Sequence, residues 1–579
     1  MGADTPDPNW TYRIPRAGQY QYPGSSAGAL YASVDDDLEF VVFLSTADIL
    51  GLGTPANVYQ VYRWERRTDE TVLASVDWRG YPSPSSCYRP TVSNGGRWVV
   101  FDTSAALVAD DTNGTWDVYG RILDEGFAEP ITVRLSVNAD GEQGNSWSAY
   151  ACVEGTDRMG EMSFGGVAFT SAASNLVPGD GNNRSDVFFL WAYVDPEWPS
   201  PIWMPDGVVL VSVNNEGEQS STTNFRTPHY GSRSSWFIGD GGNAVLFVGA
   251  PCDWTDPCVE ERNGQLVYLN CLCPDPDGEC AQDCQGVEQV YYRNLFVPHT
   301  YRASRVWLEG QGYFPGNGPS GIACLDRDAG GVLGWASTAT NFPGDADLYR
   351  DVFAIKTGVG GDGLDGHTSN RVRMSRPLGG APANGPSYFS AAGGYYFVAF
   401  ESTATNLVPG DTNAVQDVFV TYRTEETVGR FSVASDGTQA NGYSYLGGLV
   451  SSTASVDGDG GDLAVVFTSA ASNLVPGDTN GKWDIFVSLS RRFIRGDADG
   501  NGDVEFDDRE YVLEYLFSGG DPPPCMVAAD RNDDGQVNLS DTVPCMGCEP
   551  PETCCIPPPN ACGQNFTPDS LTCESYVSC

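Results

Sequence analysis

A hairpin-like phrase that recurs along the chain constrains its fold more than any other feature. It reads FTSAASNLVPGDTNGKWDIFV at 467–487, FTSAASNLVPGDGNNRSDVFF at 169–189 and FESTATNLVPGDTNAVQDVFV at 400–420, and looser copies occupy 101–119 and 335–353. Each copy joins two short apolar runs through a polar loop rich in Pro, Gly and Asp, which predicts two antiparallel strands with a long acidic connection. Regular repetition of such a unit predicts a repeat architecture.

Two further hairpins with different loops, at 41–64 and 245–292, bring the count to seven. A second phrase alternates with the hairpins, and a short β segment such as 91–101 lies between the two. Each unit therefore supplies about four strands, the content of one propeller blade, and its period of about 65 residues exceeds the ~40–50 of common blades because its loops are long. The second phrase occupies 133–148, 209–224 and 430–444, with weaker copies at 71–86, 305–320 and 372–387 and a truncated copy at 12–26.

The two ends of the repeat array are complementary. The chain opens with the fourth-strand phrase (YRIP at 12–15), and its last hairpin ends at Val487 with no such phrase after it. We therefore predict an all-β fold over 1–492, a seven-bladed β-propeller closed by the N-terminal strand, with a Cys-rich insertion at 251–285. Closure also removes the exposed sheet edges that promote aggregation. The alternative is a row of small β-sandwiches, for which about 65 residues per unit is few.

The repeats over about 10–492 resemble the blades of the periplasmic Tol-system (TolB-type) propeller family, in the variant common in secreted proteins of environmental bacteria. The shared pattern is S-DG-Q-N-S followed by VAF-S-A-NLVPGDTNG-DVFV-D. It matches best at 136–189 and 430–487 and least in the first and fourth units. The resemblance implies a propeller fold and export from a bacterial cell, without a fixed chemistry.

The net charge and the cysteine content indicate which partners and which cellular compartment this chain can have. The formal net charge of −44, from 32 basic and 76 acidic residues, argues against nucleic acid and anionic membranes as partners. Seventeen cysteines indicate an oxidising, extracellular compartment. No apolar run is long enough for a membrane span. The start MGADTPDPNW lacks signal-peptide features, so we expect a secreted or cell-surface protein whose signal is absent from this sequence.

The cysteines cluster in three places. Six lie in the insertion of the fourth hairpin, where disulfides are favoured over a zinc site because no histidine lies among them and the spacings are not C-x-x-C. Cys87, Cys152 and Cys324 lie near inner-strand positions and are expected to pair with one another. The tail 546–579, with Cys525 and Cys545, is expected to form a disulfide-rich segment. The insertion cysteines are Cys252, Cys258, Cys271, Cys273, Cys280 and Cys284; those of the tail are Cys548, Cys554, Cys555, Cys562, Cys573 and Cys579.

Two segments after the propeller have the spacing of a twelve-residue calcium loop, DADGNGDVEFDD at 497–508 and DRNDDGQVNLSD at 530–541. Alternate residues of such a loop aim oxygens at a hard cation, and a glycine at position six makes the sharp turn. Gly502 and Gly535 stand there. The alternative is a pair of acidic surface turns. The predicted Ca²⁺ ligands are Asp497, Asp499, Asn501, Asp503, Glu505 and Asp508 in the first loop, and Asp530, Asn532, Asp534, Gln536, Asn538 and Asp541 in the second, with Asp503 and Gln536 acting through their backbone carbonyls.

An aspartate at position twelve, followed but not preceded by a clear helix, resembles a type I dockerin module over 493–545. The resemblance implies a small α, EF-hand-like calcium module that binds a cohesin-like domain on an extracellular scaffold. The first helix is predicted over 507–517, ended by Gly519-Gly520. The second departs from the pattern, because Pro544 and Cys545 interrupt it. A cohesin-binding face built from both helices is therefore not assured by this sequence.

Five hairpin loops of the propeller carry the pattern D-x-[N/D]-x-x-x-D. Such a loop can be a second kind of calcium site, or its Asp and Asn side chains can form local turns that shape a wide hairpin, which we favour. In units one and four Gln60 and Gln289 replace the last Asp, so no metal is expected there. The residues of these weaker candidate sites are Asp111, Asn113, Asp117, Asp180, Asn182, Asp186, Asp345, Asp347, Asp351, Asp411, Asn413, Asp417, Asp478, Asn480 and Asp484.

No catalytic pattern is recognisable, so we do not expect an enzyme. The histidines, His229, His299 and His367, lie in unrelated surroundings, and no nucleophile elbow, H-E-x-x-H pair or phosphate loop occurs. The favoured function is a secreted, calcium-binding propeller protein that acts as an extracellular binding or scaffold module, attached or assembled through its dockerin-like C-terminus to a protein or cell-surface component. Glycans are a further candidate ligand.

Two alternatives remain open. The first is an extracellular polysaccharide-active enzyme, a glycosidase or lyase, which a funnel with clustered Tyr, Trp and two close carboxylates would favour. The second is a self-assembling surface-layer or filament subunit. A featureless or plugged channel would instead favour the binding or scaffold module.

Overall fold

The computed structural model describes residues 11–542 and 563–564 with gaps. The longer gaps cover 16–28, 124–128, 195–200, 228–243, 250–256, 271–286, 326–331, 357–371, 423–427, 452–462, 500–505 and 531–535, and shorter ones interrupt other loops. The calcium-loop residues 501–505 and 531–535 and most of the insertion and tail cysteines lie outside the described residues.

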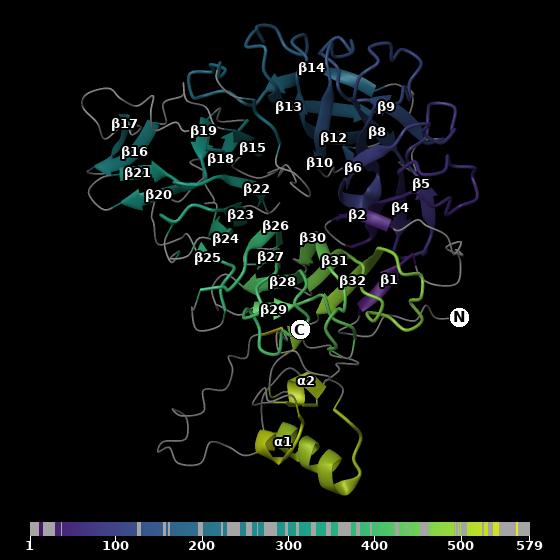
Figure 1. Cartoon of the computed structure of the whole chain (residues 1–579), viewed down its shortest axis with the longest axis vertical. Coiled ribbons are helices and arrows are strands. Elements are labelled where there is room, and N and C mark those ends of the chain that lie inside the picture. The colour runs from purple at the N-terminus through teal and green to yellow at the C-terminus, as the bar shows by residue number, and fades with distance from the viewer. Residues whose placement is uncertain are drawn as a thin grey trace.

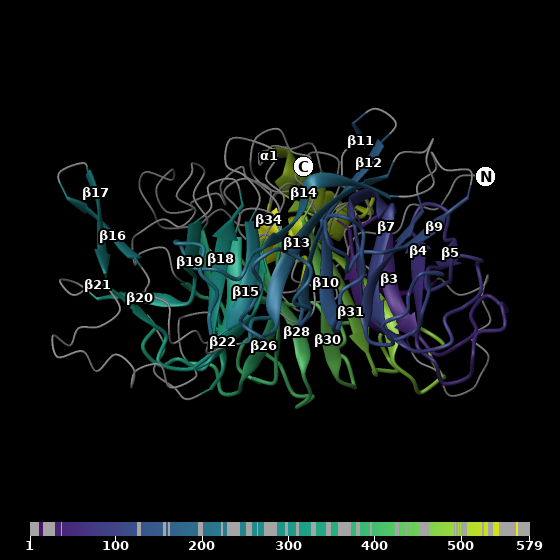
Figure 2. The same cartoon turned by 90° about the horizontal axis from the view of Figure 1, so that it is seen from above.

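The repeats fold as antiparallel sheets arranged around a central axis (Figure 1), and the strands run along that axis when the ring is seen from its side (Figure 2). This confirms the all-β propeller. The second strand of each sheet is an apolar run buried on both faces, as in β7 (Trp98–Thr103), β27 (Phe397–Ser402) and β31 (Leu463–Ser469). Burial on both faces follows because each sheet packs between two neighbours.

Six sheets have four or more strands. The first three, in chain order, are β2 (Ala29–Val34), β3 (Phe40–Ser45), β4 (Gln60–Glu65) and β5 (Thr71–Leu73); β6 (Cys87–Val92), β7, β8 (Asp117–Ile122) and β9 (Ile131–Arg134); and β10 (Ser148–Glu154), β12 (Met162–Ser171), β13 (Asp186–Val194) and β14 (Pro201–Leu210) with the short β11 (Arg158–Met159). The other three are β22 (Ser320–Leu325), β23 (Val332–Ser337), β24 (Asp351–Lys356) and β25 (Val372–Arg373); β26 (Ser387–Gly393), β27, β28 (Asp417–Tyr422) and β29 (Val428–Arg430); and β30 (Ser444–Ser451), β31, β32 (Asp484–Ser490) and β1 (Thr11–Ile14).

The prediction of seven four-stranded blades is wrong in the fourth repeat, so the described residues form six blades. The sheet there has three strands, β15 (Ala244–Gly249), β18 (Gln289–Asn294) and β19 (His299–Arg302). Where the other sheets have an innermost strand, it has one isolated bridge between Arg226 and Val248. The residues that follow Thr227, 228–243, lie outside the described part of the chain. Two further hairpins in this region are β16 (Pro257–Arg262) with β17 (Gln265–Asn270), and β20 (Arg305–Leu308) with β21 (Gly312–Pro315).

The closure of the ring by the N-terminal strand is confirmed. β1 pairs antiparallel with β32, with Thr11 opposite Ser488 and Ile14 opposite Ile485. The Thr11 hydroxyl also donates to the Val433 carbonyl at 2.6 Å, which ties β1 to the preceding repeat. The two ends of the repeat array, more than 400 residues apart, are thus joined by a backbone ladder.

A buried serine fixes the register of the outer strands in six repeats. Its hydroxyl donates to the Asp or Gln that begins the third strand, at 2.5–2.7 Å, and accepts the next backbone N–H at 2.9–3.2 Å. We call this arrangement the serine clasp. The pairs are Gln60–Ser75, Asp117–Ser136, Asp186–Ser212, Gln289–Ser304, Asp351–Ser375 and Asp417–Ser432.

The closing sheet lacks the serine clasp. By register, Pro15 stands where the other repeats have serine, opposite Asp484. The Oδ1 atom of Asp484 is buried and has no hydrogen-bond partner within the described part of the chain. Arg13 partly compensates, because its Nη1 lies 3.5 Å from both Asp478 and Asp484.

The C-terminal module has a small core of its own. Helix α1 (Phe506–Leu513) continues as a π-helical turn (Glu514–Ser518) and ends at Gly519, whose φ of 72° is the left-handed value that glycine tolerates. This confirms the predicted helix to within a residue at each end. Val512 packs with Ala498 and Ala529, the last residue of α2 (Met526–Ala529). The second loop ends in a 3₁₀ turn (Leu539–Thr542).

No helix in the described ranges is long and apolar enough to cross a membrane.

We predict that Arg13→Met destabilises the ring by about 1–3 kcal/mol, because it leaves two buried carboxylates without their cation. The measurement is the free energy of unfolding from denaturant titration followed by far-ultraviolet circular dichroism. Arg67→Met is the matched control, since Arg67 is 77% exposed in its pair with Glu65 and should change stability by less than about 0.5 kcal/mol. Equal stabilities of the two variants would contradict the role of Arg13.

Candidate ligand-binding site at the channel mouth

The innermost strands of all six blades carry a bulge at the same level. The pairing with the second strand shifts register between Leu30/Ser33, Tyr88/Thr91, Ala149/Cys152, Gly321/Ala323, Tyr388/Ser390 and Leu446/Gly448. At four of these bulges a non-glycine residue has a positive φ, namely Tyr31 (54°), Arg89 (50°), Tyr150 (58°) and Ile322 (49°). That conformation is unfavourable for L-residues and tends to occur at functional positions.

The bulges surround a cavity of about 650 Å³ at one end of the central channel. It lies at the end that carries the hairpin loops, since its lining includes Thr403, just after β27, and Gln416 and Trp483, just before β28 and β32. We call it the channel mouth. Its lining comes from all six blades and includes every one of the four strained bulge residues. The positive-φ residues of the innermost strands therefore all lie at one cavity, whereas the other non-glycine residues with positive φ lie outside its lining.

Aromatic rings form much of the wall. Tyr445 and Trp483 lie with ring centroids 5.3 Å apart, and Tyr445 is 44% exposed. On the other side, the Arg89 guanidinium lies 4.1 Å from the centroid of the Tyr150 ring, a cation–π contact. Tyr31 is 46% exposed and also lines the cavity. The mouth thus presents aromatic faces to whatever enters it.

A buried ion pair holds Arg89 in place. Its Nε and Nη2 donate to the two carboxylate oxygens of Asp102 at 2.7 and 2.8 Å, and the Tyr150 backbone N–H donates to Asp102 at 2.9 Å. Burial raises the pKa of Asp102 to about 6, against the opposing effect of Arg89. Because Asp102 is fully buried, the pair orients Arg89 toward the cavity without exposing its carboxylate.

Glu401 is the carboxyl group in the lining itself. The Leu446 backbone N–H donates to its Oε1 and the Gln416 amide to its Oε2, both at 2.7 Å. The residue is 7% exposed, and burial raises the pKa of its carboxyl to about 8, while both hydrogen bonds lower it. Burial therefore favours the protonated form of Glu401 above the pH at which a glutamate ordinarily ionises.

Asp102 and Glu401 occupy the same position in different repeats, one residue after an aromatic residue of the second strand, Phe101 or Phe400. In both, the carboxylate accepts a backbone N–H from the next innermost strand, and Thr170 does the same for Thr227. These side chains therefore link neighbouring sheets as well as shaping the mouth. The position is filled by Leu44, Asp102, Thr170, Val248, Ala336, Glu401 and Thr468.

Four of the five acidic hairpin loops show local hydrogen bonds among the described residues. In the sixth repeat the Asn413 amide donates to Asp417 at 2.8 Å and to the Ala440 carbonyl at 2.9 Å, while its oxygen accepts the Val415 N–H. Asn113, Asn182 and Asn480 donate to Asp117, Asp186 and Asp484 in the same way. This geometry is that of side-chain turns, the reading favoured above for these loops.

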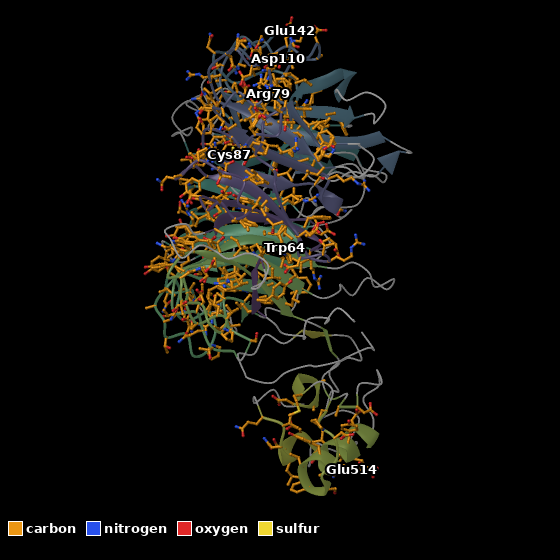
Figure 3. The ribbon with its side chains drawn as sticks, turned by 90° about the vertical axis from the view of Figure 1, so that its right-hand side faces the viewer. Trp64, Arg79, Cys87, Asp110, Glu142 and Glu514 are labelled. Carbon is orange, nitrogen blue, oxygen red and sulfur yellow. The ribbon has the colours of Figure 1, made fainter. Side chains whose placement is uncertain are left out.

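An arginine of the fourth strand reaches the loop carboxylates in several repeats. Arg430 Nη1 lies 3.1 Å from Asp411 and 3.7 Å from Asp417, and Arg373 lies 2.8 Å from Asp351. In the loop of the fifth repeat, Asp345 is described, and Asp347 lies outside the described residues. Figure 3 shows Asp110 and Glu142 near the top of the view, at the rim of the ring; Arg134 Nη2 lies 2.9 Å from Asp110 Oδ2. Calcium binding by these loops stays a prediction.

The two C-terminal loops are described in part. Asp508 Oδ1 accepts the N–H groups of Ala498 and Asp499 at 2.6 and 3.2 Å, and Asp541 accepts the N–H of Asn538 at 2.9 Å. Asp508, Asp530 and Asp541 are buried. Asp497, Asn501, Asp503, Glu505, Asn532 and Asp534 lie outside the described residues. The aspartate at position twelve of each loop, Asp508 or Asp541, thus accepts hydrogen bonds from backbone N–H groups of its own loop. Calcium binding at the two loops stays a prediction.

The expected pairing of Cys87, Cys152 and Cys324 is wrong, since none of the three is in a disulfide. They lie on three different innermost strands, and their side chains are buried; Cys87 and Cys152 pack in separate cores between neighbouring sheets. Burial raises the pKa of the Cys87 thiol to about 12, so it is not a reactive thiolate. Figure 3 shows Cys87 within the ring.

Sequence reasoning missed the channel mouth. The signal was present as departures from the repeat at matched positions, FDT at 101–103 and FES at 400–402 where better copies read FTS. A tyrosine also recurs near the start of the innermost strands, at Tyr150, Tyr388 and Tyr445. What the sequence did not reveal is that the bulges turn these side chains toward one cavity.

Comparisons with known proteins add little to this picture. No family model and no curated protein matches the chain. Among solved structures, it is similar to Trypanosoma rangeli sialidase in complex with the inhibitor DANA (10% identity, TM-score 0.30, 72% of this chain and 56% of that chain). It is also similar to an oligogalacturonate lyase in complex with manganese (10%, 0.33, 80% and 89%) and to the WD40 domain of SCAP from fission yeast (9%, 0.33, 83% and 94%).

The chain spans less than two thirds of the length of the sialidases, 56–59%. At these TM-scores the likenesses say nothing about activity. The propeller assignment rests on the sheet topology described above.

We predict that Glu401 makes stability fall as pH rises. Its folded-state pKa of about 8 lies above the ordinary 4.5, so the folded state holds the proton more tightly than the unfolded chain. The free energy of unfolding should therefore drop by roughly 2–4 kcal/mol between pH 4.5 and pH 8 relative to Glu401→Gln, which does not titrate. Denaturant titrations of both proteins across this range measure the difference. Glu510→Gln, at an exposed helix position, is the control, and identical pH profiles for wild type and Glu401→Gln would refute the claim.

Proposed function

We propose that this protein is an extracellular binding module whose ligand site is the channel mouth and whose C-terminal calcium module attaches it to a partner. One observation carries the proposal: four strained bulge residues from different blades, Tyr31, Arg89, Tyr150 and Ile322, converge on a single cavity. Strain that a purely structural ring would avoid indicates a selected function. The cavity volume also lies within the ~300–1,000 Å³ typical of small-ligand sites.

The distribution of carboxylates supports binding over catalysis. Retaining and inverting glycosidases use two carboxyl groups that flank the scissile bond. In the described lining of the mouth, Glu401 is the carboxyl group, and Asp102 is covered and bonded to Arg89 and Tyr150. The mouth has the clustered Tyr and Trp side chains that a polysaccharide-active enzyme would need. Its described lining residues do not include a second carboxylate.

One observation keeps a polysaccharide-active enzyme as the second candidate. The raised pKa of Glu401 leaves a protonated carboxyl group at neutral pH, which is the state that a general acid needs. Release of reducing ends or unsaturated products from a polysaccharide panel, abolished in Glu401→Gln, would favour this candidate.

The finer features of the fold belong to the same proposal. The Tol-type repeats and the seventeen cysteines support export. The dockerin-like module supports attachment, and its exposed Phe517 and Leu539 offer apolar surface to a protein partner such as a cohesin-like domain. Assembly with further copies into a surface layer would use the same module.

We predict that Ca²⁺ stabilises the C-terminal module, by about 2.7 kcal/mol when free Ca²⁺ is 100 times the dissociation constant. The double variant Asp508→Asn/Asp541→Asn should lose this effect, because asparagine keeps an oxygen for the loop N–H groups and removes the charge. Calorimetric scans with Ca²⁺ and with chelator measure it. Asp521→Asn, at an exposed position outside both loops, should respond like wild type. A double variant that still gains stability from Ca²⁺ would show that the ligands are elsewhere.

We also predict that Thr403→Trp, which plugs the mouth from the half-buried Thr403, abolishes ligand binding without unfolding the ring. The test exposes fluorescently labelled intact protein to a glycan array and a peptide array. Thr112→Trp, in the hairpin loop of another repeat, is the matched control. Signals lost in the plugged variant alone support a site at the mouth. An absence of plug-sensitive signals on both arrays would refute it.

A further inference from the structure

We infer that the channel mouth recognises an uncharged oligosaccharide. This inference rests on the proposed function and names the ligand class of the same site. It follows from three properties of the lining: flat aromatic faces, hydroxyl and amide groups between them, and the near absence of net charge in a strongly acidic protein.

The aromatic faces suit sugar rings. A pyranose has apolar C–H faces and a polar edge, and it stacks on Tyr and Trp side chains, which combine a large apolar surface with a polar tip. Tyr445 and Trp483 form one such surface, with ring planes inclined at 41° and centroids 5.3 Å apart. Tyr31 and Tyr150 contribute from the blades that follow the closing sheet around the ring, and Tyr388 lines the same cavity.

The polar groups between the rings suit hydroxyls. Thr403, Thr468, Ser33 and Thr91 line the mouth, and a hydroxyl both donates and accepts. Gln416 is held by its bond to Glu401, which fixes the direction of its amide. Such a set of groups matches the alternating donors and acceptors of a sugar edge. A purely apolar ligand would gain no hydrogen bonds from these groups, whereas the hydroxyls of a sugar both donate and accept.

The charges in the lining argue for an uncharged ligand. Arg89 and Glu401 are the charged residue types among the lining residues. Both carboxylate oxygens of Asp102 already receive the Arg89 fork, so Arg89 has limited capacity for a uronic acid. The overall charge of −44 repels acidic polysaccharides, while the guanidinium of Arg89 in the wall repels amino sugars that carry a positive charge.

The size of the cavity sets the length of the ligand. About 650 Å³ is well above the requirement of one sugar ring and accommodates roughly two to three. The mouth is open on the side of the hairpin loops, so a longer chain can extend outward from it. We therefore expect affinity to rise from mono- to trisaccharide and then to level off.

The test uses the intact protein in Ca²⁺ and isothermal titration calorimetry. The probes are di-, tri- and tetrasaccharides of glucose, xylose, galactose, mannose and N-acetylglucosamine, with oligogalacturonates and glucosamine oligomers as charged counterparts. At least one neutral series should bind, and Tyr445→Ala should weaken it about tenfold or more, as expected for loss of one stacking surface. Trp78→Ala, at a 52% exposed tryptophan that does not line the mouth, should stay within twofold of wild type.

The outcomes separate this inference from the proposed function. Binding of only charged oligosaccharides, or plug-sensitive binding of peptides with no response to any neutral sugar, would overturn the inference and leave a binding site at the mouth. Neutral-sugar binding that survives both Tyr445→Ala and Thr403→Trp would overturn it as well, because the sugar would lie elsewhere. If neither the glycan array nor the peptide array shows binding that Thr403→Trp abolishes, the proposed function itself is refuted.

Discussion

The serine clasp is the interaction on which the rest of the ring depends. In six repeats a buried hydroxyl ties the fourth strand to the first residue of the third, so it fixes where the hairpin loop ends and the strand begins. The residue just before that point, Gln416 in one repeat, then projects toward the channel mouth. A shift of one residue at the clasp would move every such side chain to the opposite face of its sheet. The register of the outer strands thus determines which side chains line the channel mouth.

On this frame, the candidate site arises from differences between repeats. The clasp serine recurs in six repeats and the loop asparagine in four, whereas the position after the second-strand aromatic changes from Leu44 to Asp102, Thr170 and Glu401. The constant positions maintain the fold, and the variable ones line or support the cavity. A ring of similar blades can therefore carry one asymmetric site without loss of its repeating hydrogen bonds.

The fold was largely predictable from the sequence because hairpin repeats and end phases are local patterns. The closure by Thr11–Ile14 and the helix after Phe506 followed from such patterns. The three-stranded sheet of the fourth repeat did not, because its hairpin and serine clasp follow the same local pattern as those of the four-stranded sheets. The channel mouth was not predictable either. The directions of the Tyr31 and Arg89 side chains depend on β-bulges, which the local sequence does not indicate. Buried Cys87 shows the same limit, because cysteine is also a small apolar core residue.

The closing sheet has a mechanical consequence. β32 leads directly toward the C-terminal module, and β1 is held to it by four paired residues and by Arg13, with Pro15 in place of the clasp serine. If the module is anchored and the mouth holds a polymer, tension between the two passes through this seam. The antiparallel ladder is then loaded along its strands, so its hydrogen bonds share the force rather than break one at a time. The seam between the two ends of the repeat array is where such a ring would first open under tension.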